Sequence, residues 1–104
     1  DSMVNVNIAP EEHPAIAEKF TLFQNYPNPF NSSTTIRYTI PQKSNVKLTV
    51  LDLLGREVME LVDGEQNPGE HQVLIRTDQL ASGCYFYRLK YKDQILVGKM
   101  LLLK

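Results

Sequence analysis

The residues whose side chains could perform catalysis or bind a metal are few and scattered along the chain. His13 follows Glu11 and Glu12 in a segment interrupted by prolines, and three polar neighbours of this kind define no metal geometry. His71 begins an alternating run, and no serine or aspartate motif lies near it in sequence to make it a general base. We therefore expect His13 to be solvated and His71 to pack at the rim of a core.

The single cysteine, Cys84, lies where a strand needs a small apolar side chain, so we expect a packed thiol and not a nucleophile. One cysteine also excludes an internal disulfide and a multi-cysteine metal site. Five acidic residues are expected in solvated turns and lack the spacing of a calcium loop: Asp52, Asp63, Glu65, Asp78 and Asp93. We predict a protein that is not an enzyme and that has no catalytic residue, metal or cofactor.

Aromatic residues could instead form a surface on which sugar rings stack. The candidates are Tyr26, Phe30, Tyr38, Tyr85, Phe86, Tyr87 and Tyr91. The chain has no tryptophan, and most of these positions are ones that a strand core requires. Asn31-Ser32-Ser33 also fits the N-glycosylation pattern, which is short and arises often by chance. Carbohydrate binding is therefore an alternative and not the leading prediction.

Length, composition and charge limit the classes of protein to which the chain could belong. A length of 104 residues and an apolar fraction of 42% suit one globular domain with a real core. The 11 basic and 12 acidic residues give a net charge of −1, which argues against a nucleic-acid partner or membrane insertion. No apolar run approaches the ~18 residues of a membrane span. The chain opens with neither a basic nor an apolar stretch, so we expect a piece of a longer protein.

From residue 20 onward apolar residues alternate with polar ones, which indicates β-strands. We expect strands over residues 20–24, 34–40, 46–50, 57–62, 71–76, 83–89 and 95–103. Turn signals separate them, among them Gly55, which is placed for a positive φ, and a polar loop bracketed by residues 63–64 and 68–69. Short strands with regular turns and no helix are typical of an all-β, immunoglobulin-like antiparallel β-sandwich.

Two details refine this prediction. Leu80 and Gly83 precede Tyr85 at a strand start, which suits a tyrosine corner whose hydroxyl bonds upstream backbone at one end of the sandwich. The last strand is apolar on both faces, with Leu96, Met100 and Leu102 on one and Ile95, Val97, Leu101 and Leu103 on the other. Such a strand is either central or covered by a partner, and the pattern leaves its register open.

Residues 1–19 differ from the rest of the chain. Pro10 and Pro14 interrupt them, and their composition favours a linker from an upstream domain. The alternation of Val4, Val6 and Ile8 leaves a short first strand as the alternative. The folded domain is expected over residues 20–104.

The segment over residues 24–31, which we call the proline loop, separates the linker and first strand from the regular strands. Its X-Pro steps at Pro27 and Pro29 hold the preceding residues extended and remove two backbone donors, so no helix passes through it. Its three asparagines can bond nearby backbone groups, as turn residues do. Tyr26 and Phe30 supply apolar contacts. We expect an ordered loop that both rings pin to the core and that is locked to a sheet edge.

Three runs of the sequence resemble the type A C-terminal sorting domains of the type IX secretion system, also called the Por system. The proline loop with residues 33–36 resembles the opening motif of that family, and residues 50–58 resemble its central hairpin. Residues 80–89 and 99–104 resemble its last two strands. The family motif falls on Tyr26, Pro27, Asn28, Pro29, Phe30, Gly55, Gly83, Tyr85, Lys99 and Lys104.

The departures from the family pattern are small. Ser32 stands where a second proline is usual, Cys84 replaces a β-branched residue and Leu51 replaces an aromatic one. These changes affect the local geometry of the proline loop and leave the fold pattern intact.

The resemblance implies a non-catalytic sorting module at the C-terminus of a secreted cargo protein of a Gram-negative bacterium. It implies recognition by the outer-membrane export machinery after transit through the periplasm. It also implies, in many cargos, removal by a sortase-like protease, with the mature protein released or attached to surface lipopolysaccharide. The linker would then join the cargo domain and hold the cleavage region. The alternatives are a carbohydrate-binding module and a structural spacer, either of them attached to a secreted hydrolase.

Overall fold

The structure is a computed structural model that describes residues 19–76 and 78–104. The expected linker, and the alternative strand around Val6, lie outside the described residues except for Lys19. The described residues form seven strands and no helix. The strands are β1 (Thr21–Leu22), β2 (Ser33–Ile40), β3 (Ser44–Leu51), β4 (Glu57–Gln66), β5 (Gly69–Arg76), β6 (Gly83–Tyr91) and β7 (Gln94–Leu102).

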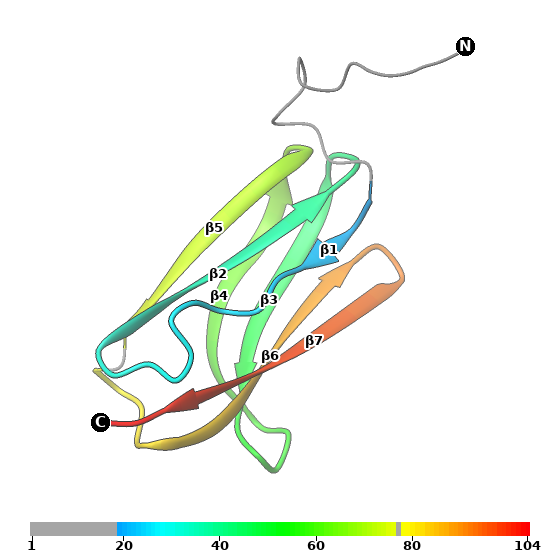
Figure 1. Ribbon diagram of the computed structural model, residues 1–104. Helices are drawn as coiled ribbons and strands as arrows, with labels where there is room; N and C mark the ends of the chain where they lie inside the picture. The colour runs from blue at the N-terminus through cyan, green and yellow to red at the C-terminus, as the bar shows by residue number, and fades with distance from the viewer. Residues whose placement is uncertain (1–18, 77) are drawn as a thin grey trace.

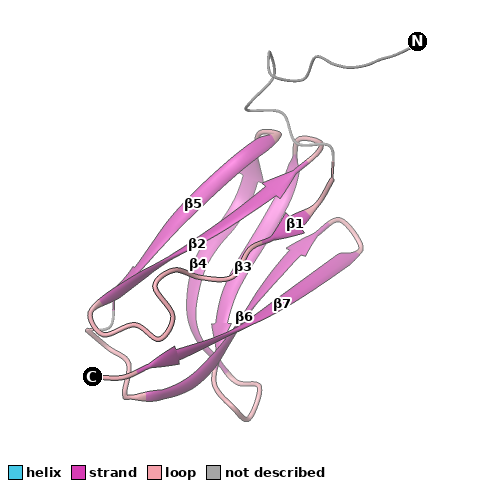
Figure 2. Ribbon diagram, in the orientation of Figure 1, coloured by secondary structure: helices cyan, strands magenta, loops and turns pink. Residues whose placement is uncertain are grey.

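The strands make two antiparallel sheets that pack face to face (Figures 1 and 2). One sheet has the order β1-β2-β5 and the other has the order β4-β3-β6-β7. In immunoglobulin terms β3, β6 and β7 take the places of strands C, F and G, and β4 takes that of C′. The predicted all-β, seven-stranded antiparallel sandwich is confirmed.

The strand boundaries differ from the predicted ones most clearly at β4. The polar loop expected from residue 63 is wrong, because β4 continues to Gln66, which pairs with Ser44 of β3. Asp63 and Glu65 therefore lie in a strand and not in a turn. The cross-strand ladder outweighs the turn preference of residues 63–64, and only residues 67–68 remain between β4 and β5.

Alternating side chains of both sheets form the core, as the period-two pattern predicts. On β2 the inward residues are Ile36, Tyr38 and Ile40, and all three are fully buried. The remaining core residues include Val46, Leu48, Val50, Ile75, Leu80, Tyr85, Tyr87, Leu89, Tyr91, Met100 and Leu102. Burying a side chain of this size stabilises the fold by ~1.5–3 kcal/mol, so the two inner faces hold the sheets together.

Tyr87 of β6 lies across Gly98, its cross-strand partner on β7. A Cβ added at Gly98 would overlap the Tyr87 ring. The space above Gly98 lets the ring cross β7 and bring its hydroxyl to the start of the proline loop. There the hydroxyl donates to the Phe23 carbonyl at 3.0 Å and accepts from the Asn25 N–H at 3.0 Å.

Tyr38 is buried in a different way. Its ring stacks on His71 at a centroid distance of 5.2 Å, and its buried hydroxyl bonds none of the described residues. Burial raises the pKa of the Tyr38 and Tyr87 phenols above the ordinary 10.0. A raised folded-state pKa means that the unfolded phenol ionises first, so the contribution of both groups to stability is present below pH 10 and is lost as the pH rises through their folded values.

We predict that Gly98→Ala lowers the free energy of unfolding by about 1–3 kcal/mol, because the added methyl group must displace the Tyr87 ring. Chemical denaturation measures this change. Gly64→Ala is the matched control, since Gly64 also lies in a strand and has nothing within 4 Å of an added Cβ. Equal stability losses in the two variants would show that the Tyr87 ring does not need the space.

We also predict that Tyr87→Phe lowers the free energy of unfolding by about 1–3 kcal/mol, because it leaves the Asn25 N–H and the Phe23 carbonyl unpaired. Tyr38→Phe should leave stability unchanged or raise it, because it removes a buried hydroxyl that bonds no described residue. Thermal or chemical denaturation of both variants makes the comparison. A larger loss from Tyr38→Phe would contradict it.

Candidate functional site

The structure brings most of the motif residues to one end of the sandwich. The proline loop runs from β1 to β2 and lies beside the carboxyl-terminal half of β7 (Figure 1). The start of β6, with Gly83 and Tyr85, lies at the same end, as does Lys104. Gly55 lies in the turn between β3 and β4, and the residues on both sides of it line a shallow pocket together with Gly83 and Tyr85.

Backbone hydrogen bonds join the proline loop to the outer edge of β7. Phe30 donates its N–H to the Leu101 carbonyl at 2.9 Å, and its carbonyl accepts from the Leu103 N–H at 2.8 Å. The pairing is parallel and centres on Leu102. The predicted loop locked to a sheet edge is therefore confirmed. The last strand is therefore not central but an edge strand, and the loop pairs with its carboxyl-terminal half. Ile95, Val97 and Leu103 on its second apolar face are more than half exposed.

Two side chains extend this attachment. The Asn28 side-chain oxygen accepts from the Leu101 N–H at 2.9 Å. The Gln24 amide donates to the Lys99 carbonyl at 2.8 Å. The loop thus satisfies four successive outward-facing backbone groups of β7 and its C-terminal extension, two through main chain and two through side chains. Sequence reasoning expected Asn28 to bond nearby backbone, but its partner lies 73 residues away.

Asn25 is the buried anchor of the loop, and its side chain is 1% exposed. Its amide nitrogen donates to Thr34 Oγ1 at 2.9 Å and to the Pro27 carbonyl at 3.2 Å. Its side-chain oxygen accepts from Gln24 at 2.6 Å. Thr34 in turn donates to the Pro27 carbonyl at 2.8 Å. This network, together with the Tyr87 hydroxyl, satisfies buried polar groups that would otherwise destabilise the loop.

The two aromatic residues of the loop have opposite roles. Phe30 is 2% exposed and belongs to the core, as predicted. The prediction that Tyr26 also pins the loop is wrong, because Tyr26 is 80% exposed. Its backbone makes an antiparallel bridge with Thr35, with N···O distances of 3.0 and 2.9 Å, and its side chain is left in solvent. The peptide bonds before Pro27 and Pro29 are both cis.

Gly55 shapes the turn between β3 and β4. Its φ of 83° confirms the expected positive value, which favours glycine. The Asp52 carboxylate accepts from the Leu54 and Arg56 N–H groups and from the Arg56 side chain, all at 2.9 Å. The Arg56 N–H is the main reason that the pKa of Asp52 lies below its usual range. These contacts assign Gly55 a structural role.

Tyr85 forms the predicted tyrosine corner. Its hydroxyl donates to the Ala81 carbonyl at 2.6 Å, and Gly83 precedes it with a φ of 150°. The Lys104 N–H donates to Ser82 Oγ at 2.9 Å, so the loop before β6 also holds the chain that follows β7. Gly83 and Tyr85 therefore build the end of the sandwich at which the proline loop and Lys104 meet.

The two motif lysines are exposed. Lys99 lies on β7 and Lys104 follows that strand. Neither ammonium group makes an ion pair with a described residue. Tyr26, Lys99 and Lys104 are thus the motif side chains that are available to a partner, together with the exposed Pro27, Asn28 and Pro29.

The other candidate groups show no assembled chemistry. His71 is half-buried and its Nε2 lies 2.7 Å from the Asn67 carbonyl, and Cys84 is a half-buried free thiol. Within residues 19–76 and 78–104 no three histidine, cysteine or acidic side chains gather as metal ligands. Of the seven aromatic residues considered for sugar stacking, only Tyr26 is exposed, so they form no shared platform. In the same part of the chain no helix is long and apolar enough to cross a membrane.

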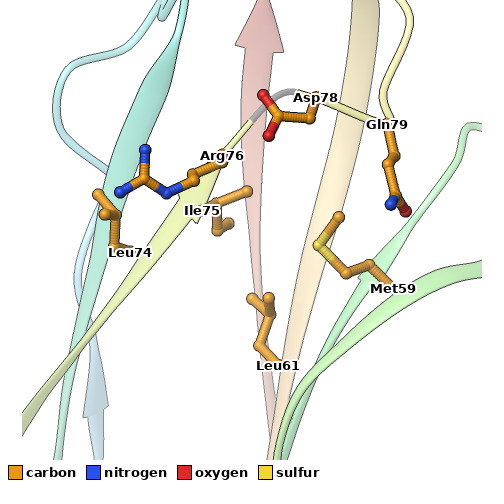
Figure 3. Close-up of a pocket in the computed structure, with 7 residues that line it drawn as sticks. All are labelled: Met59, Leu61, Leu74, Ile75, Arg76, Asp78 and Gln79. Atoms are coloured by element: carbon orange, nitrogen blue, oxygen red, sulfur yellow. The ribbon is translucent and has the colours of Figure 1, made fainter.

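One cavity, of about 340 Å³, opens between β4 and β5 (Figure 3). Its apolar part is formed by Met59, Leu61, Leu74 and Ile75. Arg76, Asp78 and Gln79 lie at the end of β5 and just after it. None of the motif residues contributes to it. The cavity and the attached proline loop are therefore separate features of the fold.

Comparison with known protein families gives one match, to the secretion-system C-terminal sorting domain, over residues 24–103. No curated protein and no solved structure matches the chain. The match begins at Gln24, the first loop residue that bonds β7. It ends at Leu103, which directly follows β7 and is the last residue that the loop bonds. The chain therefore belongs to the family of C-terminal sorting domains of the type IX secretion system.

Proposed function

We propose that this domain is recognised as a folded surface made by the proline loop together with β7, and not as a linear tail. A type IX sorting signal directs secretion across the outer membrane, and the family assigns that general role to this chain. The observation that supports a folded signal is the set of bonds from Gln24, Asn28 and Phe30 to residues 99–103. Two segments more than 70 residues apart in sequence thereby present one surface.

The exposed part of this surface supplies the recognition groups in our proposal. Tyr26 offers an exposed ring, Lys99 and Lys104 offer unpaired ammonium groups, and the two prolines fix the path of the loop between them. Phe30, Gly55, Gly83 and Tyr85 act through folding, since they are buried or occupy turns and strand starts. No catalytic residue is required, and none of the described contacts suggests one.

The finer steps of export are also part of the proposal. A cargo domain precedes the chain, passes through the periplasm of a Gram-negative bacterium and is delivered to the outer-membrane machinery by this domain. A sortase-like protease then cuts within residues 1–19, and the mature protein is released or attached to surface lipopolysaccharide. The sequence composition of that segment supports the cut site, because proteases act on extended and accessible chain.

Sorting by this domain is tested by fusing residues 1–104 behind a periplasm-directed fluorescent protein in a host that carries the type IX machinery. We expect the reporter in the medium or on the cell surface, and its loss from both places in an export-deficient strain. A reporter that stays in the periplasm while the domain is folded would favour a spacer or a carbohydrate-binding module instead. Retention on insoluble polysaccharides would then identify the latter.

The folded-signal proposal makes a sharper prediction. Asn28→Ala removes the acceptor of the Leu101 N–H and should reduce export of the reporter several-fold, because the loop loses one of its attachments to β7. His71→Gln is the control, since His71 lies on the other sheet and should leave export unchanged. Circular dichroism of both purified domains checks that they are folded. Full export of a folded Asn28→Ala domain would contradict the proposed surface.

A further inference from the structure

The amino-terminal half of β7 is an open sheet edge. The proline loop bonds the backbone of Leu101 and the carbonyl of Lys99 on the side of β7 that faces away from β6. Because backbone groups alternate in direction along an antiparallel strand, those of Ile95 and Val97 face the same side. None of the described residues bonds them. Figure 1 shows the loop beside the C-terminal half of β7. β1 of the other sheet also lies close to β7, but no backbone bond joins it to Ile95 or Val97.

This edge lacks the features that protect the opposite edge of the same sheet. The register of β4 on β3 shifts twice, and β4 carries four carboxylates: Glu57, Glu60, Asp63 and Glu65. The carboxylates are close enough that Asp63, through a hydrogen bond and repulsion, raises the pKa of Glu60. Irregular pairing and charge both discourage an added strand. The Gln94–Gly98 segment of β7 has no register shift, no proline and no charged residue.

The side chains at the open edge are apolar and lie among positive charges. Ile95 is 53% exposed and Val97 is 57% exposed. Lys90 pairs across the ladder with Ile95, and Lys99 is two residues beyond Val97 on the same face. Neither ammonium group makes an ion pair with a described residue. From Leu89 onward the chain has five basic or acidic side chains, of which only Asp93 is acidic.

From these features we propose that the Gln94–Gly98 edge binds an extended segment of the export machinery, which adds to the sheet as a further strand. Because Ile95, Val97, Lys90 and Lys99 share one face, every second residue of that strand lies on this face, and these residues are apolar at its centre and acidic at its ends. Its backbone would bond the free groups of Ile95 and Val97, and its apolar side chains would cover theirs. Its carboxylates would meet Lys90 and Lys99. This inference rests on the proposed sorting function and names the partner surface that the function uses.

A second copy of this chain fits the edge poorly. Pairing of two β7 edges would bring the Lys90 and Lys99 side chains of both copies onto one sheet, where like charges repel. The acidic strand of a second copy is β4, whose two register shifts interrupt regular pairing. The added strand also continues a mode that the domain already uses, since the proline loop pairs with the other half of the same edge.

Binding is tested with two synthetic probes, the peptides acetyl-Glu-Thr-Val-Thr-Val-Thr-Glu-amide and acetyl-Lys-Thr-Val-Thr-Val-Thr-Lys-amide, titrated into the isotope-labelled chain. In each peptide the valines and the charged residues lie on the same face of an extended strand. We expect chemical-shift changes in residues 94–99 and slower amide exchange at Ile95 and Val97. The glutamate peptide should bind about tenfold more tightly at low salt, and 0.5 M salt should reduce the difference because it screens the charges. Shift changes elsewhere, no binding at millimolar concentration, or equal binding of the two peptides would overturn the proposal.

Variants separate backbone pairing from charge. Lys99→Glu should reverse the peptide preference, and Val97→Pro should abolish binding because it removes an outward-facing N–H. Leu74→Ser is the matched control, since Leu74 is 51% exposed on the other sheet and should bind both peptides as the unchanged chain does. If Val97→Pro does not fold, Lys99→Glu still decides, because an unchanged preference in that variant contradicts the assignment.

The export assay separates this inference from the function on which it rests. If the unchanged reporter fusion is not exported, the sorting function fails whatever the peptides do. If it is exported and Lys99→Glu is exported equally well, sorting stands and the export machinery does not use this edge. Loss of export in folded Lys99→Glu, with export of Leu74→Ser preserved, supports the edge as the partner surface.

Discussion

The exposed backbone of the last strand is the constraint that organises this domain. A sheet edge presents unpaired N–H and C=O groups, and such groups pair with water, with other chains or with covering segments of the same chain. Here residues 24–30 cover four of these groups, using the backbone of Phe30 and the side chains of Gln24 and Asn28. The loop can do this only because its two prolines and its buried asparagine fix its path. The end of the sandwich is built around that attachment.

The attachment in turn depends on polar groups that are buried under the loop. Asn25 holds the loop from inside, and the Tyr87 hydroxyl reaches it across Gly98. Each of these groups would destabilise the core if its partner were missing, because a buried polar group without a hydrogen bond loses its hydration and gains nothing in return. The network therefore makes the loop conformation specific as well as stable. A surface that a partner must recognise benefits from such rigidity, since less conformational entropy is lost on binding.

Period-two alternation predicts the seven strands and most of the core, because each strand has one face in water and one in the sandwich. The tyrosine corner and the turn at Gly55 also follow from local sequence, since their partners lie within a few residues. The network around Asn25 does not, because Tyr87 is 62 residues away and nothing local marks the pair. Tyr26 was misassigned for a related reason: the loop's bridge to Thr35 decides which of its two rings is buried. The turn preference of residues 63–66 predicts a loop, but their pairing with β3 outweighs that preference and keeps them in β4.

The close approach of Tyr87 to Gly98 also decides how β7 is aligned. A strand that is apolar on both faces can slip by one residue and still bury apolar side chains, so its hydrophobic pattern does not fix one alignment. A slip of one residue would place Val97 or Lys99 opposite Tyr87, and a slip of two would place Leu96 or Met100 there. Each of these has a side chain where the Tyr87 ring now lies. Because Gly98 has no side chain, only its position accepts the Tyr87 ring, and this fixes the alignment of β7 on β6. The alignment in turn determines which backbone groups of β7 face the proline loop.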